Sequence, residues 1–157
     1  TATTGNNTYT GGAGVDTVTV GGGSNSLTLA AGNDVVSITA ASANVNTYTT
    51  IVDAAKGDSL TFVDWGTETF ASTKVSLAAT AVFQDYANAV IAAAGNASVN
   101  GAFGWFQYGG DTYLVESRHD GTTDTGFKNG TDFIVKMIGL VDLSTATGAG
   151  SNTLVLA

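Results

Sequence analysis

The sequence contains no cysteine and no proline, and its only imidazole is that of His119. Without cysteine the chain can hold neither a disulfide framework nor a zinc ribbon or finger, whose ligands are clusters of Cys and His. Without proline, a collagen-type triple helix is excluded as well. No run of 18 apolar residues is present, so no segment of the sequence predicts a membrane-spanning helix.

Basic residues are also scarce, because five Lys and Arg stand against 13 Asp and Glu and give a formal net charge of −8. This charge would repel a polyanion, so nucleic-acid binding is disfavoured. Only Glu68 and Glu116 are Glu; the other acidic residues are Asp, the carboxylate that suits turns and hard-cation sites. Hydrophobic residues make up 43% of the 157 residues, which is enough for a folded core. The surplus of Asp makes calcium a reasonable ligand.

A repeat with a period of nine residues opens the chain, in units 2–10, 11–19, 20–28 and 29–37. The fourth position of each unit is Gly, the sixth is Asn or Asp, and the eighth is large and apolar. These columns hold Gly5, Gly14, Gly23 and Gly32; Asn7, Asp16, Asn25 and Asp34; and Tyr9, Val18, Leu27 and Val36. Each unit predicts a tight turn followed by a short strand that points one apolar side chain inward between outward hydroxyls. Such strands bury their apolar residues only by coiling and stacking, which predicts a parallel β-solenoid.

The sixth-position residues are expected to separate by edge. If each unit makes half a turn, units two apart lie directly above each other. Asp16 and Asp34 then share one edge of the solenoid, and Asn7 and Asn25 share the other.

Residues 11–19 (GGAGVDTVT) fit the pattern G-G-x-G-x-D-x-U-x at every specified position, and the repeats therefore resemble those of RTX calcium-binding proteins. The resemblance implies a calcium-binding β-roll, with Asp16 and Asp34 as side-chain ligands. It also implies carbonyl ligands, offered by Gly12, Gly14 and Gly32. At the other edge Asn replaces Asp, which favours a hydrogen-bonded ladder without metal, or at most a weak site. The alternative is that both columns only cap their turns.

A different use of the solenoid is also open. Its Thr-bearing face, with Thr17, Thr19, Ser26 and Thr28, would suit an ice- or glycan-binding surface, although these hydroxyls are few.

After Ile38 the nine-residue register decays, and residues 50–62 predict a strand, a turn and a second strand. This stretch resembles the segment that closes the calcium roll in type I secreted proteins. The resemblance implies that Asp53 and Asp58 join a metal site, the alternative being that they only shape turns. We therefore expect a β-roll domain over residues 1–62.

Residues 63–157 predict a β-rich C-terminal domain with one α-helix. The helix is expected over about residues 78–94, where Val82, Phe83 and Tyr86 recur on one apolar face, with Phe83 and Tyr86 in the core. A β-hairpin is expected over about residues 103–116, and later strands are expected at residues 132–138 and 153–157. The predicted fold class is mainly β.

The order of helix, aromatic hairpin and small-plus-apolar tail resembles the C-terminal regions of surface-layer and adhesin-type RTX proteins. This implies an extracellular, non-enzymatic cell-surface protein exported by type I secretion, with calcium as its cofactor. The alternative is the calcium-roll and secretion domain of a secreted enzyme such as a protease or lipase. A solenoid that starts at Ala2 exposes a strand edge, so the expected partners are further copies of the chain or an upstream domain. A cell-surface glycan is a further expected partner. Neither nucleic acid nor membrane insertion is expected.

Candidates for catalysis are sparse. His119 has no accompanying nucleophile elbow, and we expect it to be a solvated loop residue. A second calcium site among Asp111, Asp120, Asp124 and Asp132 is an alternative to a simply polar loop.

Overall fold

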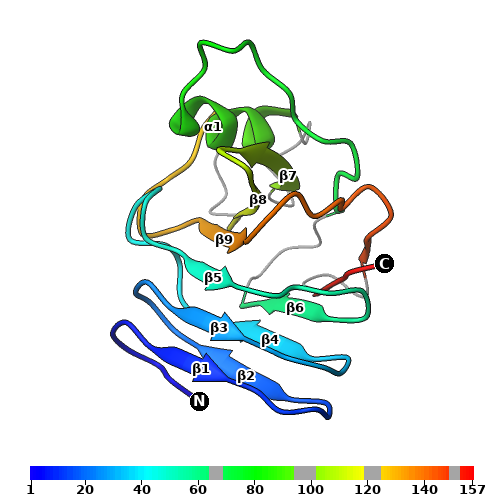
Figure 1. The fold of residues 1–157 in the computed structure, drawn as a ribbon. Coiled ribbons are helices and arrows are strands. Elements are labelled where there is room, and N and C mark those ends of the chain that lie inside the picture. Colours follow the sequence, from blue (N-terminus) through cyan, green and yellow to red (C-terminus); the bar gives the residue numbers. More distant parts are fainter. Residues whose placement is uncertain (64–68, 94–101, 119–124, 149–152) are drawn as a thin grey trace.

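The chain folds into two β-sheets and one helix, seen as a ribbon in Figure 1. This computed structural model describes residues 1–63, 69–93, 102–118, 125–148 and 153–157. The elements are β1 (Thr8–Thr10), β2 (Thr17–Val20), β3 (Ser26–Thr28), β4 (Val35–Ile38), β5 (Thr49–Ile51), β6 (Ser59–Phe62), α1 (Phe83–Ala93), β7 (Ala102–Tyr108), β8 (Asp111–Ser117), β9 (Phe133–Met137), β10 (Thr147–Gly148) and β11 (Thr153–Val155). One sheet has the order β1-β3-β5-β9-β8-β7, and the other has the order β10-β11-β6-β4-β2.

The N-terminal repeats form the predicted parallel β-roll. Strand β1 pairs in parallel with β3, and β2 pairs in parallel with β4. Thr8 lies opposite Ser26 and Thr17 opposite Val35, so strands 18 residues apart are neighbours. Two nonapeptides therefore make one coil, and each nonapeptide supplies one strand to each sheet.

A third coil follows where the sequence predicts only closing strands. Strands β5 and β6 continue the two parallel stacks, with Ser26 opposite Thr50 and Val35 opposite Ser59 at a spacing of 24 residues. The longer spacing comes from residues 39–48, which enlarge one turn, while residues 53–58 keep the turn length of residues 11–16.

The roll and the C-terminal half share one hydrophobic core. The inward residues Leu27, Val36 and Leu60 are at most 1% exposed and belong to the same cluster as Trp105 and Leu154. The sheets are continuous as well, because β5 pairs with β9 and β6 pairs with β11. The roll is therefore packed against the C-terminal strands, and the division at residue 62 stays a prediction.

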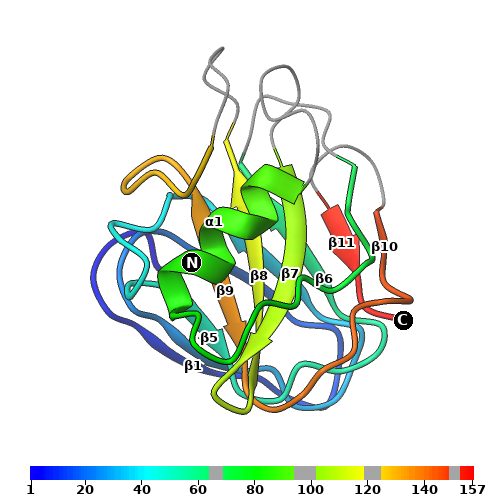
Figure 2. The ribbon, with the colours of Figure 1, turned by 90° about the horizontal axis from the view of Figure 1, so that it is seen from above.

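The helix packs across β7 and β8, on the face of the larger sheet opposite the core that the roll shares (Figure 2). It begins at Phe83, later than expected, because Asp85 Oδ2 accepts the Val82 N–H at 2.9 Å and caps the first turn. Val82 is 56% exposed, so its expected place on the apolar face is wrong. As expected, Phe83 and Tyr86 are core residues: they pack against a hydrophobic cluster on the helix side of the larger sheet, separate from the core that the roll shares. In the described parts of the chain, no helix is long and apolar enough to cross a membrane.

Hydroxyl side chains line up across the outer face of the smaller sheet. In register, Thr19 lies opposite Ser37, Ser37 opposite Thr61, and Thr61 opposite Thr153. The hydroxyls of Thr61 and Thr153 are 3.1 Å apart. Thr17 and Thr19 of the predicted hydroxyl face lie on this sheet, and the row continues into the C-terminal strand. Ser26 and Thr28 do not share this face, because β3 belongs to the larger sheet.

Candidate metal centre

The sixth-position residues form two columns at the turns of the roll. One edge carries Asp16, Asp34 and Asp58, because the Asp16 N–H donates to Asp34 and the Asp34 N–H donates to Asp58. The opposite edge carries Asn7 and Asn25 above Thr49. The structure therefore separates the Asp and Asn residues as the half-turn hypothesis predicts, and the third coil adds Asp58 to the Asp column.

The Asp column is held by backbone amides. Asp34 is fully buried, and its Oδ1 accepts the Asp16 N–H at 2.7 Å. Asp16 Oδ2 accepts the Gly12 N–H at 2.7 Å. Asp58 is 3% exposed and uses both oxygens, Oδ1 with the Asp34 N–H at 3.0 Å and Oδ2 with the Ala55 N–H at 2.9 Å. Each carboxylate thus fixes a turn of the roll.

One oxygen of this column lacks a partner. Asp34 Oδ2 is buried and makes no hydrogen bond in the described structure. A buried carboxylate oxygen without a donor is costly, because it has lost its water and gained nothing in exchange. A bound cation would satisfy this oxygen.

Glycine leaves room for oxygen atoms around the same column. A Cβ at Gly32 would lie 2.6 Å from Gly14 O and 3.0 Å from Asp34 Oδ1. At Gly11 it would lie 2.6 Å from Asp16 Oδ2 and would also meet Leu29 O. These cradles are lined by carboxylate and carbonyl oxygens, the donor set that calcium prefers. The residues therefore fit calcium.

The metal role of the residues that the sequence predicts at this edge stays a prediction. Asp16 and Asp34 would supply carboxylates, and the turn glycines Gly12, Gly14 and Gly32 would supply carbonyls. Gly12 O already accepts the Ala31 N–H at 3.2 Å and keeps a second lone pair. Within the residues that the structure describes, no three His, Cys, Asp or Glu side chains converge. A calcium ion here would accordingly depend on backbone carbonyls for much of its coordination.

Tyr9 is a contact of the Asp column that the sequence does not predict. It occupies an inward apolar position of the first unit, yet its phenol interacts with the Asp16 carboxylate. Burial raises the pKa of Tyr9, and the neighbouring Asp16 and Asp34 raise it further. The phenol is thus placed to donate to Asp16. The only signal in the sequence is that Tyr, alone among the eighth-position residues, has a polar tip.

The Asn edge is a hydrogen-bonded ladder, as predicted. Asn7 Nδ2 donates to Asn25 Oδ1 at 2.9 Å, to Gly5 O at 2.9 Å and to Thr4 O at 3.2 Å. Asn25 Nδ2 donates to Gly21 O and to Thr49 Oγ1, both at 3.2 Å. The amide nitrogens of the Asn edge are thus surrounded by oxygen atoms and donate hydrogen bonds to them. At the Asp edge, a cation would have to supply the positive charge in the corresponding positions.

Asp53 holds the turn of the preceding coil. Its two carboxylate oxygens accept the N–H groups of Leu29 and Ala30, each at 2.8 Å. Ala30 has a φ of 70°, an unfavourable conformation for a residue with a Cβ, and these bonds help to maintain it. These contacts support the alternative that Asp53 shapes a turn. Its metal role stays a prediction.

The C-terminal acidic residues that the structure describes are engaged locally. Asp132 accepts the N–H groups of Arg118 at 3.2 Å and Lys128 at 2.6 Å. Asp111 accepts the Gly139 N–H at 2.8 Å and pairs with Lys136 Nζ at 2.7 Å. The other two acids of the predicted second site, and the lone histidine, lie outside the described residues: Asp120, Asp124 and His119.

Asp111→Asn is expected to flatten the acid end of the stability profile. The bonds from Lys136 and Gly139 lower the pKa of Asp111. The carboxylate therefore stabilises the fold above its unfolded pKa of about 3.9, and this is lost as the pH falls through the lower folded value. Urea unfolding between about pH 2 and 7 should show a smaller pH dependence in the variant. An unchanged profile would contradict this role.

Two comparisons with known proteins bear on this geometry. The whole chain matches no curated protein. Residues 1–36, however, match the RTX calcium-binding nonapeptide repeat in four copies. Repeats of this kind are typical of extracellular proteins exported by type I secretion. The N-terminal coils of this chain thus match RTX calcium-binding repeats, and repeats of this kind imply a calcium-binding secreted protein.

Proposed function

We propose that this chain is a non-enzymatic part of a cell-surface protein of the surface-layer or adhesin type, whose roll folds on calcium. The observation that carries the proposal is the fully buried Asp34, whose Oδ2 has no partner within the described structure. Its neighbours Asp16 and Asp58 bring two further carboxylates to the same column. The column thus brings carboxylates from three successive coils to one edge of the roll.

The mechanism is thermodynamic linkage between ion binding and folding. Without calcium, the buried carboxylate and its neighbours oppose the closing of the coils. Calcium binds the folded roll and not the extended chain, so it adds to the free energy of unfolding. Because the roll shares its core with the C-terminal strands, this stabilisation reaches the whole described fold. Export in a loose state and folding outside the cell would follow from the difference in calcium concentration.

The test is thermal unfolding of the full chain, followed by circular dichroism, in chelator and in millimolar calcium. If calcium is present at about 100 times its dissociation constant, it adds about 2.7 kcal/mol. For a chain of this size that corresponds to a rise of about 5–10 °C in Tm. Magnesium at the same concentration serves as the control, since it demands a tighter octahedral site. Identical curves in chelator and calcium would refute the proposal.

The choice between a surface protein and the export domain of an enzyme depends on what the complete gene encodes around this chain. A catalytic domain in the same reading frame would favour the alternative, a calcium roll that serves the export of a secreted enzyme. A reading frame made only of repeats and non-catalytic modules would favour the surface protein.

The outer edge of β1 is the surface that we propose for self-association or for an upstream coil. Asn7 O accepts the Ser26 N–H and Gly11 N donates to Thr28 O, so these two residues face β3. Because successive residues of a strand alternate, the amides of Thr8 and Thr10 face away from the roll. An open edge of this kind can pair with another strand.

Thr10→Pro is expected to reduce self-association while leaving the roll folded. Proline removes an outward N–H and is tolerated on edge strands. Light scattering in calcium should show a smaller average mass for the variant than for the wild type. Thr10→Val, which keeps the N–H, is the matched control. A wild type that is monomeric at all concentrations, or a variant that assembles equally well, would contradict this use of the edge.

A further inference from the structure

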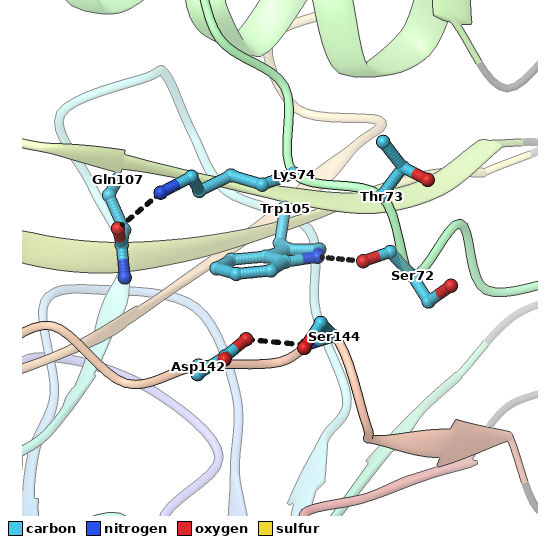
Figure 3. A pocket seen from close by; sticks show the side chains of 7 residues that line it. All are labelled: Ser72, Thr73, Lys74, Trp105, Gln107, Asp142 and Ser144. Carbon is cyan, nitrogen blue, oxygen red and sulfur yellow. Dashed lines mark hydrogen bonds between the residues drawn. The ribbon is translucent and has the colours of Figure 1, made fainter.

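An open pocket of about 470 Å³ lies beside β7, outside the roll. Figure 3 shows Trp105 at its centre, with Lys74 on one side of the indole and with Asp142 and Ser144 on the other. The indole is only 2% exposed, and its Nε1–H donates to Ser72 O at 2.9 Å. The ring is therefore held in one orientation and forms the floor of the pocket.

The walls of the pocket are fixed by hydrogen bonds. Gln107 Oε1 accepts Lys74 Nζ at 2.8 Å, and Gln107 Nε2 donates to Val141 O at 3.2 Å. The Thr112 hydroxyl bonds to the same Val141 O at 3.0 Å. These contacts tie the loop that carries Asp142 to β7 and β8. A pocket that is already formed loses little entropy when it binds a ligand.

Its two charged groups are exposed and of opposite sign. Lys74 Nζ lies 5.9 Å from the centroid of the Trp105 ring, a cation–π contact. The backbone N–H and hydroxyl of Ser144, together with the charge of Lys74, lower the pKa of Asp142. At neutral pH the pocket therefore offers an ionised carboxylate as acceptor and an ammonium as donor, with no net charge between them.

We propose that this pocket binds one neutral, hydroxyl-rich saccharide unit, with Asp142 accepting from sugar hydroxyls and Lys74 donating to a sugar oxygen. The hydroxyls of Ser72 and Ser144 at its rim suit the same ligand. The volume lies within the range of about 300–1,000 Å³ that small-molecule sites occupy. The site is separate from the Asp column, so it stands independently of the proposed calcium function.

The test is a titration of the ¹⁵N-labelled, calcium-loaded full chain with neutral methyl glycosides of glucose, galactose, mannose and N-acetylglucosamine. The readout is the NMR signal of the Trp105 indole N–H. We expect a saturable shift with at least one glycoside and a dissociation constant of about 1 mM, typical of a small ligand. Asp142→Asn should weaken this binding about tenfold, because it removes a charged acceptor.

A matched control is Asp85→Asn, which makes the same charge change in α1. Asp85 lies on the opposite face of β7 from the pocket. Trp105 belongs to the hydrophobic cluster that the roll shares, whereas Phe106 belongs to the cluster against which the helix packs. This variant should leave binding unchanged. Free glycine is titrated as well, because a zwitterion could instead bind between the ammonium of Lys74 and the carboxylate of Asp142. The proposal is overturned if no glycoside gives a saturable shift, if Asp142→Asn binds as the wild type does, or if glycine binds and the glycosides do not.

Discussion

Replacing Asp34 with Asn is expected to abolish most of the calcium-dependent rise in Tm and, in chelator, to raise the Tm above that of the wild type. The substitution removes the charge that a calcium ion would neutralise. At calcium concentrations about 100 times the dissociation constant, about 2.7 kcal/mol of stabilisation would be lost. In chelator, a gain of about 1 kcal/mol is expected from satisfying a buried polar atom.

The geometry explains why both effects are expected from one change. Asn keeps an Oδ1 that accepts the Asp16 N–H, the bond present now at 2.7 Å. Its Nδ2 replaces the buried Oδ2 that has no partner. On the opposite edge Asn25 already shows this arrangement, with its Nδ2 donating to Gly21 O at 3.2 Å and to Gly23 O at 3.4 Å.

The matched control for this variant is Asp85→Asn, which removes the same charge far from the roll and retains a helix-capping side chain. Its calcium response should equal that of the wild type. If Asp34→Asn keeps the full calcium response, the Asp column is not the metal site.

Asn25→Asp is expected to have the opposite effect on the calcium-free protein. Asn25 is 2% exposed, and its amide nitrogen is surrounded by oxygen acceptors. A carboxylate oxygen placed there would face carbonyl oxygens without a donor, at a cost of about 3–5 kcal/mol. Urea unfolding in chelator measures this loss. Millimolar calcium should restore part of it, because the edge would then hold a buried carboxylate as the Asp column does.

Asn6→Asp provides the control for this change. Asn6 is exposed, and its Oδ1 accepts the Ser24 N–H at 2.8 Å, a bond that Asp can also make. Little destabilisation is expected from it. A calcium-free Asn25→Asp protein as stable as the wild type would show that the Asn ladder is not the device that makes this edge independent of metal.

The architecture of the first two coils is predictable from the sequence because three of nine positions repeat. Gly at the turns, Asx at the sixth position and an apolar eighth position together fix both the strand and the coil. The third coil is hidden by two local changes. Residues 39–48 lengthen one turn, and Lys56 stands where the other units have Gly. Only Asp58 and Leu60 keep the sixth and eighth positions of the pattern.

The candidate site was predictable in its members and not in its chemistry. The spacing alone brings Asp16 and Asp34 together, since strands 18 residues apart stack. The unpartnered Oδ2 of Asp34 depends on how each carboxylate is shared among backbone amides, which periodicity does not encode. The contact from Tyr9 depends on the reach of a long side chain across the roll. Likewise, the packing of the roll against Trp105 and Leu154 is tertiary, and no local pattern predicts it.

The most direct measurement is calorimetric titration of calcium into the chelator-stripped full chain, with Asp34→Asn titrated in parallel. The account predicts saturable binding to the wild type at calcium concentrations of about 1 mM or below, the range of extracellular calcium modules. It predicts no saturable binding, or binding at least tenfold weaker, in Asp34→Asn, because a charged ligand is removed. Equal binding by the two proteins, or no binding by the wild type, would contradict the claim that the buried Asp column holds the ion.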